Sequence, residues 1–319
     1  MKLDYLTSMM VPRRPWGQLF WANTALAANY RLPRRVEILI EGEHLIPNRP
    51  VMFAMNHTDR YNSWPFQYHF YRHREEFMAV WVKAKYYQNS FLSFCLRSTL
   101  TVPLPSRGYL LLQMFREQFG RPPAPEEYRP LRNWVDGAIG GEDALEEFSK
   151  EVQELISSPE HLARFDDLFS QMMKEVLRLN KQGMNEQGYH ILVFPQGTRS
   201  KRLLRGRTGL MQIAQHLGAT IVPVGCSGSD RCYTSAVPLA KAGRIVYRIG
   251  EPLDVNGPEL SPYRVPEKVT PLSRDAQQNH ASDYQAATDI VMQRINDLLD
   301  PEYQFGETLE KGTDLERLA

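Results

Sequence analysis

The sequence is poor in cysteine and has no excess of charge of either sign. Its 319 residues include three cysteines, Cys95, Cys226 and Cys232, and no C-x-x-C pair. So sparse and odd a set is typical of a reducing compartment rather than of a disulfide framework. The formal net charge is +1, so no field of the whole molecule attracts nucleic acid, and electrostatic recognition must be local. We therefore expect a cytoplasmic protein without a nucleic-acid partner.

Long apolar runs are lacking as well. No stretch reaches the ~20 apolar residues that span a bilayer, and the opening "MKLDYLTSMMVPRRPW" lacks the continuous apolar core of a signal peptide. Hydrophobic residues make up 42% and charged residues 24% of the chain, as in ordinary globular proteins. These features favour a folded protein that is soluble or peripheral to a membrane.

Apolar patterns of strand and helix type alternate along the chain. Strands are predicted near residues 36–40, 51–55, 77–82, 100–108, 189–197, 219–228 and 243–253, with helices between several of them. This alternation predicts an α/β fold with a mixed sheet covered by helices. We divide the chain into a basic and aromatic N-terminal segment, 1–35, a main domain, 36–255, and a helical C-terminal extension, 256–319. Within the main domain, residues 109–188 are predicted to be a helical insertion.

The N-terminal segment leaves two interpretations open. "WGQLFWANTALAANY", residues 16–30, is rich in aromatics and lies between Arg13 and Arg14 on one side and Arg31, Arg34 and Arg35 on the other. Aromatic side chains flanked by arginines suit a helix that lies in a membrane interface. The same helix could instead pack on the domain.

A basic loop follows the predicted strand at 189–197. In "FPQGTRSKRLLRGR", five basic residues and no acidic one stand between Arg199 and Arg207. Gly197 allows close approach of a ligand to the backbone, and Thr198 offers a hydroxyl. Guanidinium groups bind phosphate with paired hydrogen bonds, so we favour an anion site over a merely solvated loop.

A single histidine stands where catalytic residues of α/β sheets collect. His57 in "NHTDRYN" follows the buried strand at 51–55, and a histidine pKa near neutrality suits a general base. Asn62, rather than an aspartate, stands five positions later. Asp59 is a possible alternative carboxylate partner for the imidazole.

Four sequence blocks in order resemble the glycerolipid acyltransferases of the 1-acylglycerol-3-phosphate acyltransferase (PlsC-like) type. They are "NHTDRYN", "LTVPLPSR", "FPQGTRS" and "IVPV", and the resemblance extends from about residue 36 to residue 253. It implies transfer of a fatty acyl group from acyl-CoA or acyl carrier protein to a hydroxyl of a lysophospholipid, with His57 as general base. It also implies a role in phospholipid biosynthesis at the inner face of a membrane, without cofactor or metal. No G-x-S-x-G nucleophile motif is present, and direct transfer needs none.

The resemblance also implies which residues bind substrate. Arg107 and Arg199 match the family's phosphate-binding arginines, with Lys83 and Lys201 as assisting cations for acceptor or donor phosphates. Gln196, Gly197 and Thr198 match the loop of the third block.

Two positions depart from the family pattern. Asn62 stands where the family has aspartate, and Gln196 stands where it has glutamate. An asparagine carbonyl still orients a histidine ring but stabilises an imidazolium less than a carboxylate does. Three interpretations follow: an acyltransferase for a phosphorylated lysolipid with an altered base, an acyltransferase for another acceptor, or a non-catalytic protein that binds lipid or acyl-CoA. Retention of His57 favours an enzyme, and we expect Asn62→Asp to raise the rate of transfer.

Overall fold

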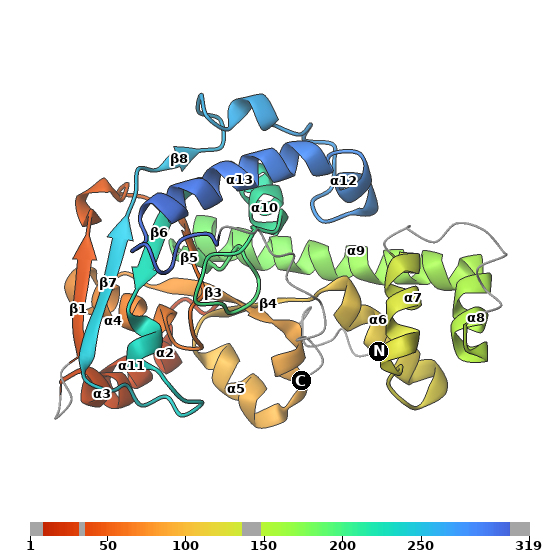
Figure 1. Ribbon diagram of the computed structural model, residues 1–319, viewed down its shortest axis with the longest axis horizontal. Helices are drawn as coiled ribbons and strands as arrows, with labels where there is room; N and C mark the ends of the chain where they lie inside the picture. The colour runs from red at the N-terminus through yellow and green to blue at the C-terminus, as the bar shows by residue number, and fades with distance from the viewer. Residues whose placement is uncertain (1–8, 32–35, 136–147, 307–319) are drawn as a thin grey trace.

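The centre of the molecule is an eight-stranded mixed sheet (Figure 1). The computed structural model describes residues 9–31, 36–135 and 148–306. Seven strands lie in the order β1-β7-β6-β2-β5-β3-β4, and β8 pairs with β6. The strands are β1 (Val36–Glu41), β2 (Met52–Met55), β3 (Met78–Lys83), β4 (Thr101–Leu104), β5 (His190–Val193), β6 (Thr220–Ser227), β7 (Gly243–Ile249) and β8 (Leu253–Asp254). The predicted α/β class with a mixed sheet is confirmed.

Strand direction decides which loops meet. β2, β3, β4, β5 and β6 run parallel, whereas β7 is antiparallel to β6 and parallel to β1. The carboxyl ends of the five parallel strands therefore lie at one edge of the sheet, where ligand sites of such sheets form. The loops after β2, β5 and β3 are neighbours there, while the loop after β4 lies at the border of the sheet.

Helices cover both faces of the sheet. Alternate side chains of β2 enter different clusters: Met52 and Ala54 pack with α9 (Pro159–Lys181), α10 (Gly209–Leu217) and α13 (Ala281–Asp297). Phe53 and Met55 pack on the other face with α4 (Ser63–Arg74) and with the N-terminal helix. Burial on both faces explains the uninterrupted apolar run of this strand.

The N-terminal helix is one continuous rod made of α2 (Trp16–Trp21), the π-helix η1 (Ala22–Leu26) and α3 (Ala27–Arg31). One side of it is buried in the domain through Ala22, Leu26 and Tyr30. The packed interpretation is therefore correct for that side. The other side carries exposed aromatic residues.

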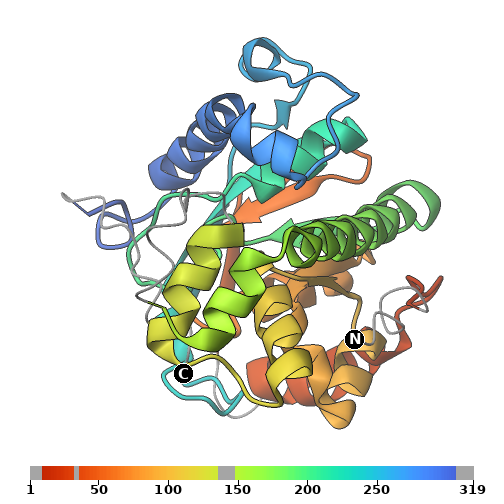
Figure 2. The same ribbon diagram turned by 90° about the vertical axis from the view of Figure 1, so that its right-hand side faces the viewer.

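The predicted insertion is helical wherever it is described. It contains α6 (Arg107–Phe119), α7 (Pro125–Val135), α8 (Lys150–Ser157), α9 and η5 (Gln182–Glu186). Figure 1 shows α6, α7, α8 and one end of α9 extending beyond the sheet, and Figure 2 shows the same helices from that side, in front of the sheet. The sequence patterns did not predict α5 (Ser90–Ser98). Short elements complete the fold: η2 (Glu43–Leu45), η3 (Ala84–Gln88), α11 (Ser229–Cys232), η6 (Ser261–Tyr263) and α12 (Arg274–Gln278). None of the helices described is long and apolar enough to cross a bilayer.

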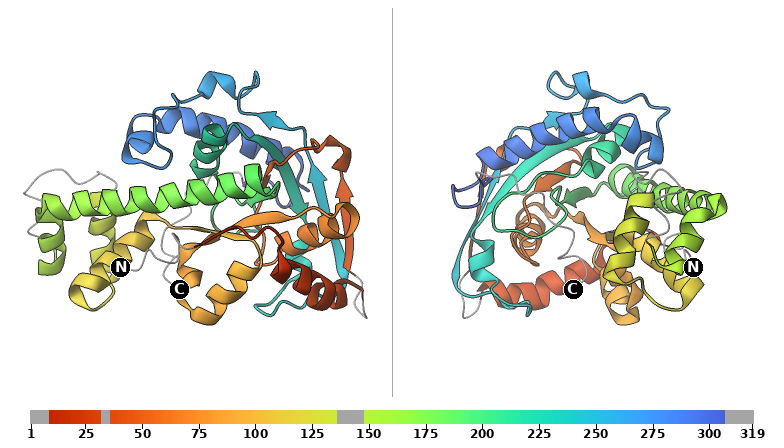
Figure 3. Two further views of the ribbon diagram at one scale, coloured as in Figure 1. Left: turned by 180° about the vertical axis from the view of Figure 1, so that it is seen from behind. Right: turned by 45° about the vertical axis from the view of Figure 1, so that its right-hand side comes forward.

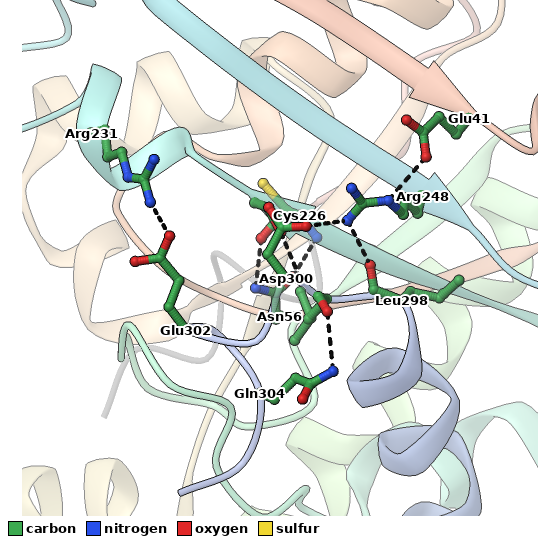
Figure 4. A network of polar contacts seen from close by, with 11 residues as sticks. Glu41, Asn56, Cys226, Arg231, Arg248, Leu298, Asp300, Glu302 and Gln304 are labelled. Carbon is green, nitrogen blue, oxygen red and sulfur yellow. Dashed lines mark hydrogen bonds and ion pairs between the residues drawn. The ribbon is translucent and has the colours of Figure 1, made fainter.

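The chain that follows α13 is fastened back onto the sheet (Figure 4). Arg248 on β7 donates to the carbonyl of Leu298 at 3.1 Å and to Asp300 at 2.8 Å, and it also pairs with Glu41. Arg231 in α11 forms an ion pair with Glu302. The C-terminal part therefore packs as part of the sheet structure, while the predicted domain boundaries stay a prediction.

Candidate active site

His57 lies two residues beyond β2, at the carboxyl edge of the parallel strands. Its imidazole stacks on the ring of Phe194, which follows β5, with 4.0 Å between centroids. Its Nδ1 lies 3.1 Å from Oδ1 of Asn62. Since that oxygen only accepts, Nδ1 carries the proton and donates it, and Nε2 keeps a free lone pair. The contact predicted from the spacing of His57 and Asn62 is present.

The amide of Asn62 is itself held in one orientation. The residue is completely buried at the start of α4. Its Nδ2 donates to the carbonyl of Asn56 at 2.8 Å, so Oδ1 must face the imidazole. Asn56 in turn joins β6, because its side chain accepts from the amide of Cys226 at 2.7 Å and donates to that residue's carbonyl at 2.9 Å (Figure 4). A carboxylate at position 62 would have no N–H group to donate to the backbone carbonyl of Asn56.

Gln196 joins the loop after β5 to the loop after β2 in a similar way. Its Oε1 accepts from the backbone amide of His57 at 3.3 Å. Its Nε2 donates to the carbonyls of Thr198 at 2.9 Å and of His57 at 3.4 Å. Both amides that depart from the family pattern therefore use their nitrogen as well as their oxygen, which a carboxylate cannot do.

The surroundings keep His57 neutral. Burial, together with the positive charges of Arg199 and Lys83, lowers the pKa of the imidazole from 6.5 to about 4, although the hydrogen bond to Asn62 acts to raise it. Asp59 does not substitute for a carboxylate partner: its oxygens accept from the amide of Tyr61 at 2.8 Å and from the hydroxyl of Thr58 at 2.9 Å. Burial raises the pKa of Asp59.

Cations from two neighbouring strands collect beside the histidine. Lys83 ends β3, and its pKa is lowered by partial burial and by the charges of Lys85, Arg207 and Arg199. Arg207 lies over the loop after β5. Gly197 has φ +70°, and a Cβ there would lie 3.0 Å from the side chain of Arg207. The glycine therefore makes room for the arginine, and the cluster of Lys83, Arg199 and Arg207 forms a positive site next to the base.

A cavity of about 430 Å³ opens beside this cluster. Its wall combines residues that directly follow His57 and Gly197 with the segment after α11. The lining residues are Thr58, Asp59, Arg60, Thr198, Arg199, Tyr233, Thr234, Ser235 and Ala236. Two arginines and five residues with a hydroxyl group line one space, which suits a phosphorylated, hydroxylated ligand.

The structure separates two of the predicted site residues from this group. Arg107 begins α6 after β4, two strands beyond β5, and is buried. It donates to the carbonyl of Val135 at 2.8 Å, lies 3.9 Å from Asp166 and sits over the ring of Phe169 at 5.4 Å. These contacts fasten α6 to α9, so the predicted phosphate contact of Arg107 does not fit its surroundings.

Lys201 also differs from its prediction. Its ammonium pairs with Glu302 at 2.6 Å and lies over the ring of Tyr303. Two further basic residues of the same loop face the C-terminal region: Arg202 contacts backbone carbonyls after α13, and Arg205 lies 3.8 Å from Asp289. Most of the basic loop therefore holds the C-terminal part of the chain, whereas Arg199 lines the cavity.

Three residues of the site were not singled out from the sequence, although Arg207 belongs to the predicted basic loop. Phe194 stacks on His57, Arg60 lines the cavity and Arg207 joins the cation cluster. Each stands inside a stretch that the motifs marked, so the sequence contained the signal but not the direction of the side chains.

Two comparisons with known proteins found a match. Residues 149–227 match a family model described as Acyltransferase, and this segment contains β5, the loop with Gln196 and Arg199, and β6. The chain is similar to the solved 1-acyl-sn-glycerophosphate (LPA) acyltransferase, PlsC, from Thermotoga maritima, with 15% identity and a TM-score of 0.39 over 86% of this chain and 76% of that one. No curated protein matches significantly. The family-model match bears out a resemblance to acyltransferases over residues 149–227.

Proposed function

We propose that this acyltransferase moves a fatty acyl group from a thioester, acyl-CoA or acyl carrier protein, to a hydroxyl of a phosphorylated lysolipid such as 1-acylglycerol-3-phosphate. His57 is the general base, and the cavity with Arg60 and Arg199 receives the phosphorylated head of the acceptor. Lys83 and Arg207 stabilise negative charge on acceptor or donor phosphates.

The observation that supports this proposal best is the state of His57. An imidazole with pKa of about 4 is unprotonated at neutral pH, and the hydrogen bond from Nδ1 to Asn62 leaves Nε2 as the free base. A protein that only binds lipid needs arginines but has no use for a neutral, oriented imidazole next to them.

The reaction then follows from the chain's own groups. Nε2 of His57 removes the proton of the acceptor hydroxyl as its oxygen attacks the thioester carbonyl carbon. The intermediate expels the thiolate, which takes the proton from the imidazolium. Asn62 supports the imidazolium with a carbonyl dipole rather than a full charge, so an acceptor held firmly by Arg60 and Arg199 compensates through positioning.

The test is incubation of the protein with acyl-CoA, or acyl carrier protein loaded with the same chain, and a panel of lyso-acceptors, with products read by mass spectrometry. We expect an acylated phospholipid from the wild type and none from His57→Ala. His216→Ala is the matched control, since this exposed histidine lies at the end of α10, outside the site. Transfer by His57→Ala at the wild-type rate contradicts the assignment of the base. Binding of acyl-CoA without any transfer by the wild type supports a non-catalytic lipid-binding protein instead.

A further inference from the structure

Exposed large hydrophobic side chains are confined to three segments of the described chain. Phe91 on α5 is 78% exposed, Phe94 72% and Trp16 on α2 67%. The complete set is Met10, Trp16, Phe20, Trp21, Tyr86, Phe91, Leu92, Phe94, Val237 and Leu239. Scattered single apolar residues need no explanation, but a set gathered in this way marks an interaction surface.

The three segments lie side by side. α2 packs against α5 so closely that a Cβ on Gly17 would lie 2.1 Å from the carbonyl oxygen of Ser98. At the other end of the same rod, Asn29 of α3 accepts from the amide of Ala240 at 2.9 Å and donates to the carbonyl of Pro238 at 3.2 Å. Figures 1 and 3 show α2, α3, α5 and the segment after α11 along one side of the molecule. We call this surface, formed by residues 10–31, 83–98 and 233–243, the aromatic face.

The charge of the aromatic face has one sign. Its three segments contain no aspartate or glutamate, and their basic residues are Arg13, Arg14, Arg31, Lys83, Lys85, Arg97 and Lys241. Two cations lie over aromatic rings of the same face: Arg14 is 4.4 Å from the ring of Trp16, and Lys85 is 5.7 Å from the ring of Tyr86. Tryptophan, phenylalanine and basic residues in one exposed layer suit the interface of a bilayer that contains anionic lipid.

We propose that the aromatic face docks on an anionic lipid bilayer, with Phe91 and Phe94 of α5 inserted beside the aromatic residues of α2. A second copy of the chain is a poorer occupant, because two aromatic faces would bring positive charge against positive charge. An anionic bilayer offers an apolar layer for the exposed aromatic side chains and negative charge for the basic ones.

Docking also places the cavity at the lipid surface. The segment that carries exposed Val237 and Leu239 begins with the cavity wall at Tyr233–Ala236, and the hydroxyl of Tyr61 donates to the carbonyl of Ala236. If the proposed function holds, a lysolipid enters the cavity from the bilayer without crossing water. This step rests on the proposed function, whereas docking itself does not.

The docking test is co-sedimentation of the full chain with vesicles of phosphatidylcholine alone or mixed with phosphatidylglycerol, without acyl donor. We expect preferential binding to the mixed vesicles, and a drop in the partition coefficient of about tenfold or more for the double variant Phe91→Ser and Phe94→Ser. Arg14→Glu with Lys85→Glu should abolish the preference for anionic lipid. Lys268→Glu, an exposed cation in the segment after η6 and outside the aromatic face, is the control and should bind as the wild type does. Thermal melting confirms that each variant is folded.

Two results overturn the proposal. One is unchanged vesicle binding by the folded phenylalanine variant. The other is a wild-type dimer, seen in sedimentation velocity, that the phenylalanine substitutions dissociate, which would make the aromatic face an interface between copies.

A kinetic experiment separates docking from catalysis. The phenylalanine variant should lose activity on vesicle-borne acceptor and keep it on a short-chain acceptor dispersed as monomers. Equal loss on both contradicts entry of the acceptor from the bilayer and leaves the binding result to be judged by itself.

Discussion

The imidazole of His57 and the amide of Asn62 face each other through Nδ1 and Oδ1, 3.1 Å apart. The orientation of the amide is fixed from behind by the carbonyl of Asn56. The asparagine therefore does more than replace an aspartate of the same shape, because it selects the tautomer of the histidine while satisfying a buried carbonyl. An aspartate at this position would place a negative charge beside the imidazole, but it could not donate a hydrogen bond to the carbonyl of Asn56.

Asn62→Asp tests these two effects together. The carboxylate favours the imidazolium and raises the pKa of His57, so we still expect faster transfer to lysophosphatidic acid. Its second oxygen would face the carbonyl of Asn56, and we expect a loss of about 1–3 kcal/mol in the free energy of unfolding. Rates and urea melts of Asn62→Asp, Gln196→Glu and the double variant separate the effects. Slower transfer with undiminished stability would indicate that the amide is adapted to a different acceptor.

The low pKa of His57 predicts an acid-tolerant enzyme. A base works only when unprotonated, which holds above its pKa, so a value of about 4 keeps the base active where an ordinary histidine with pKa near 6.5 is half protonated. We expect kcat/KM to stay level from about pH 8 to about pH 5 and to fall below that. The measurement should use an acceptor with a phosphodiester head group, because the charge of that group does not change over this pH range. A midpoint near 6.5 contradicts the prediction.

The same shift affects stability. Because the folded pKa lies below the unfolded value, the unfolded chain binds more protons in the window from 6.5 down to about 4. The free energy of unfolding therefore falls as the pH decreases through that window, and replacement of His57 by alanine should reduce this slope.

Arg199 and Lys201 provide a matched pair in one loop. Arg199 lines the cavity, whereas Lys201 is paired with Glu302. Arg199→Ala should raise the KM for a phosphorylated acceptor by about 10- to 100-fold, as expected for charge-assisted hydrogen bonds of about 1.5–3 kcal/mol. Lys201→Ala should leave that KM within about twofold. Equal effects of the two variants, or an equal response to an acceptor without phosphate, count against the phosphate site.

Gly197 and Gly218 separate backbone strain from contact with Arg207. Both have positive φ, +70° and +62°, but only a Cβ at Gly197 meets a side chain, that of Arg207. Each alanine variant should lose about 1–2 kcal/mol of stability through its left-handed backbone. Only Gly197→Ala should also weaken binding of the substrate anion. If both variants keep wild-type KM values, the position of Arg207 is not important for binding.

Arg107 is expected to affect stability more than substrate binding. Removal of its guanidinium in Arg107→Met leaves the carbonyl of Val135 without this donor and weakens the contact of α6 with α9. We expect a loss of about 2–3 kcal/mol in the free energy of unfolding with little change in KM. Arg164→Met, on the exposed side of α9, is the control and should cost less than about 1 kcal/mol. A raised KM at unchanged stability would restore the phosphate role that the motif implied.

Much of the fold and part of the site could be predicted from the sequence. Strands buried on both faces appear as short apolar runs. The residues after β2 and β5 carry recognisable motifs, so the sequence could single out His57, Asn62, Gln196 and Arg199 as candidates. α5 was missed because "SFLSFCLRS" exposes its phenylalanines. A pattern method expects those residues to face a core.

By itself, the sequence determined the α/β class, the pairing of His57 with an amide partner, and the presence of a basic loop. Only the tertiary structure decided which cations serve the site, since strand order places β4 and Arg107 away from β2 and the C-terminal segment binds Lys201. It also decided that residues 10–31, 83–98 and 233–243 form one face. The physical reason is that local patterns record how a side chain relates to its own element. Charge pairing and surface continuity depend instead on elements that are far apart in the chain.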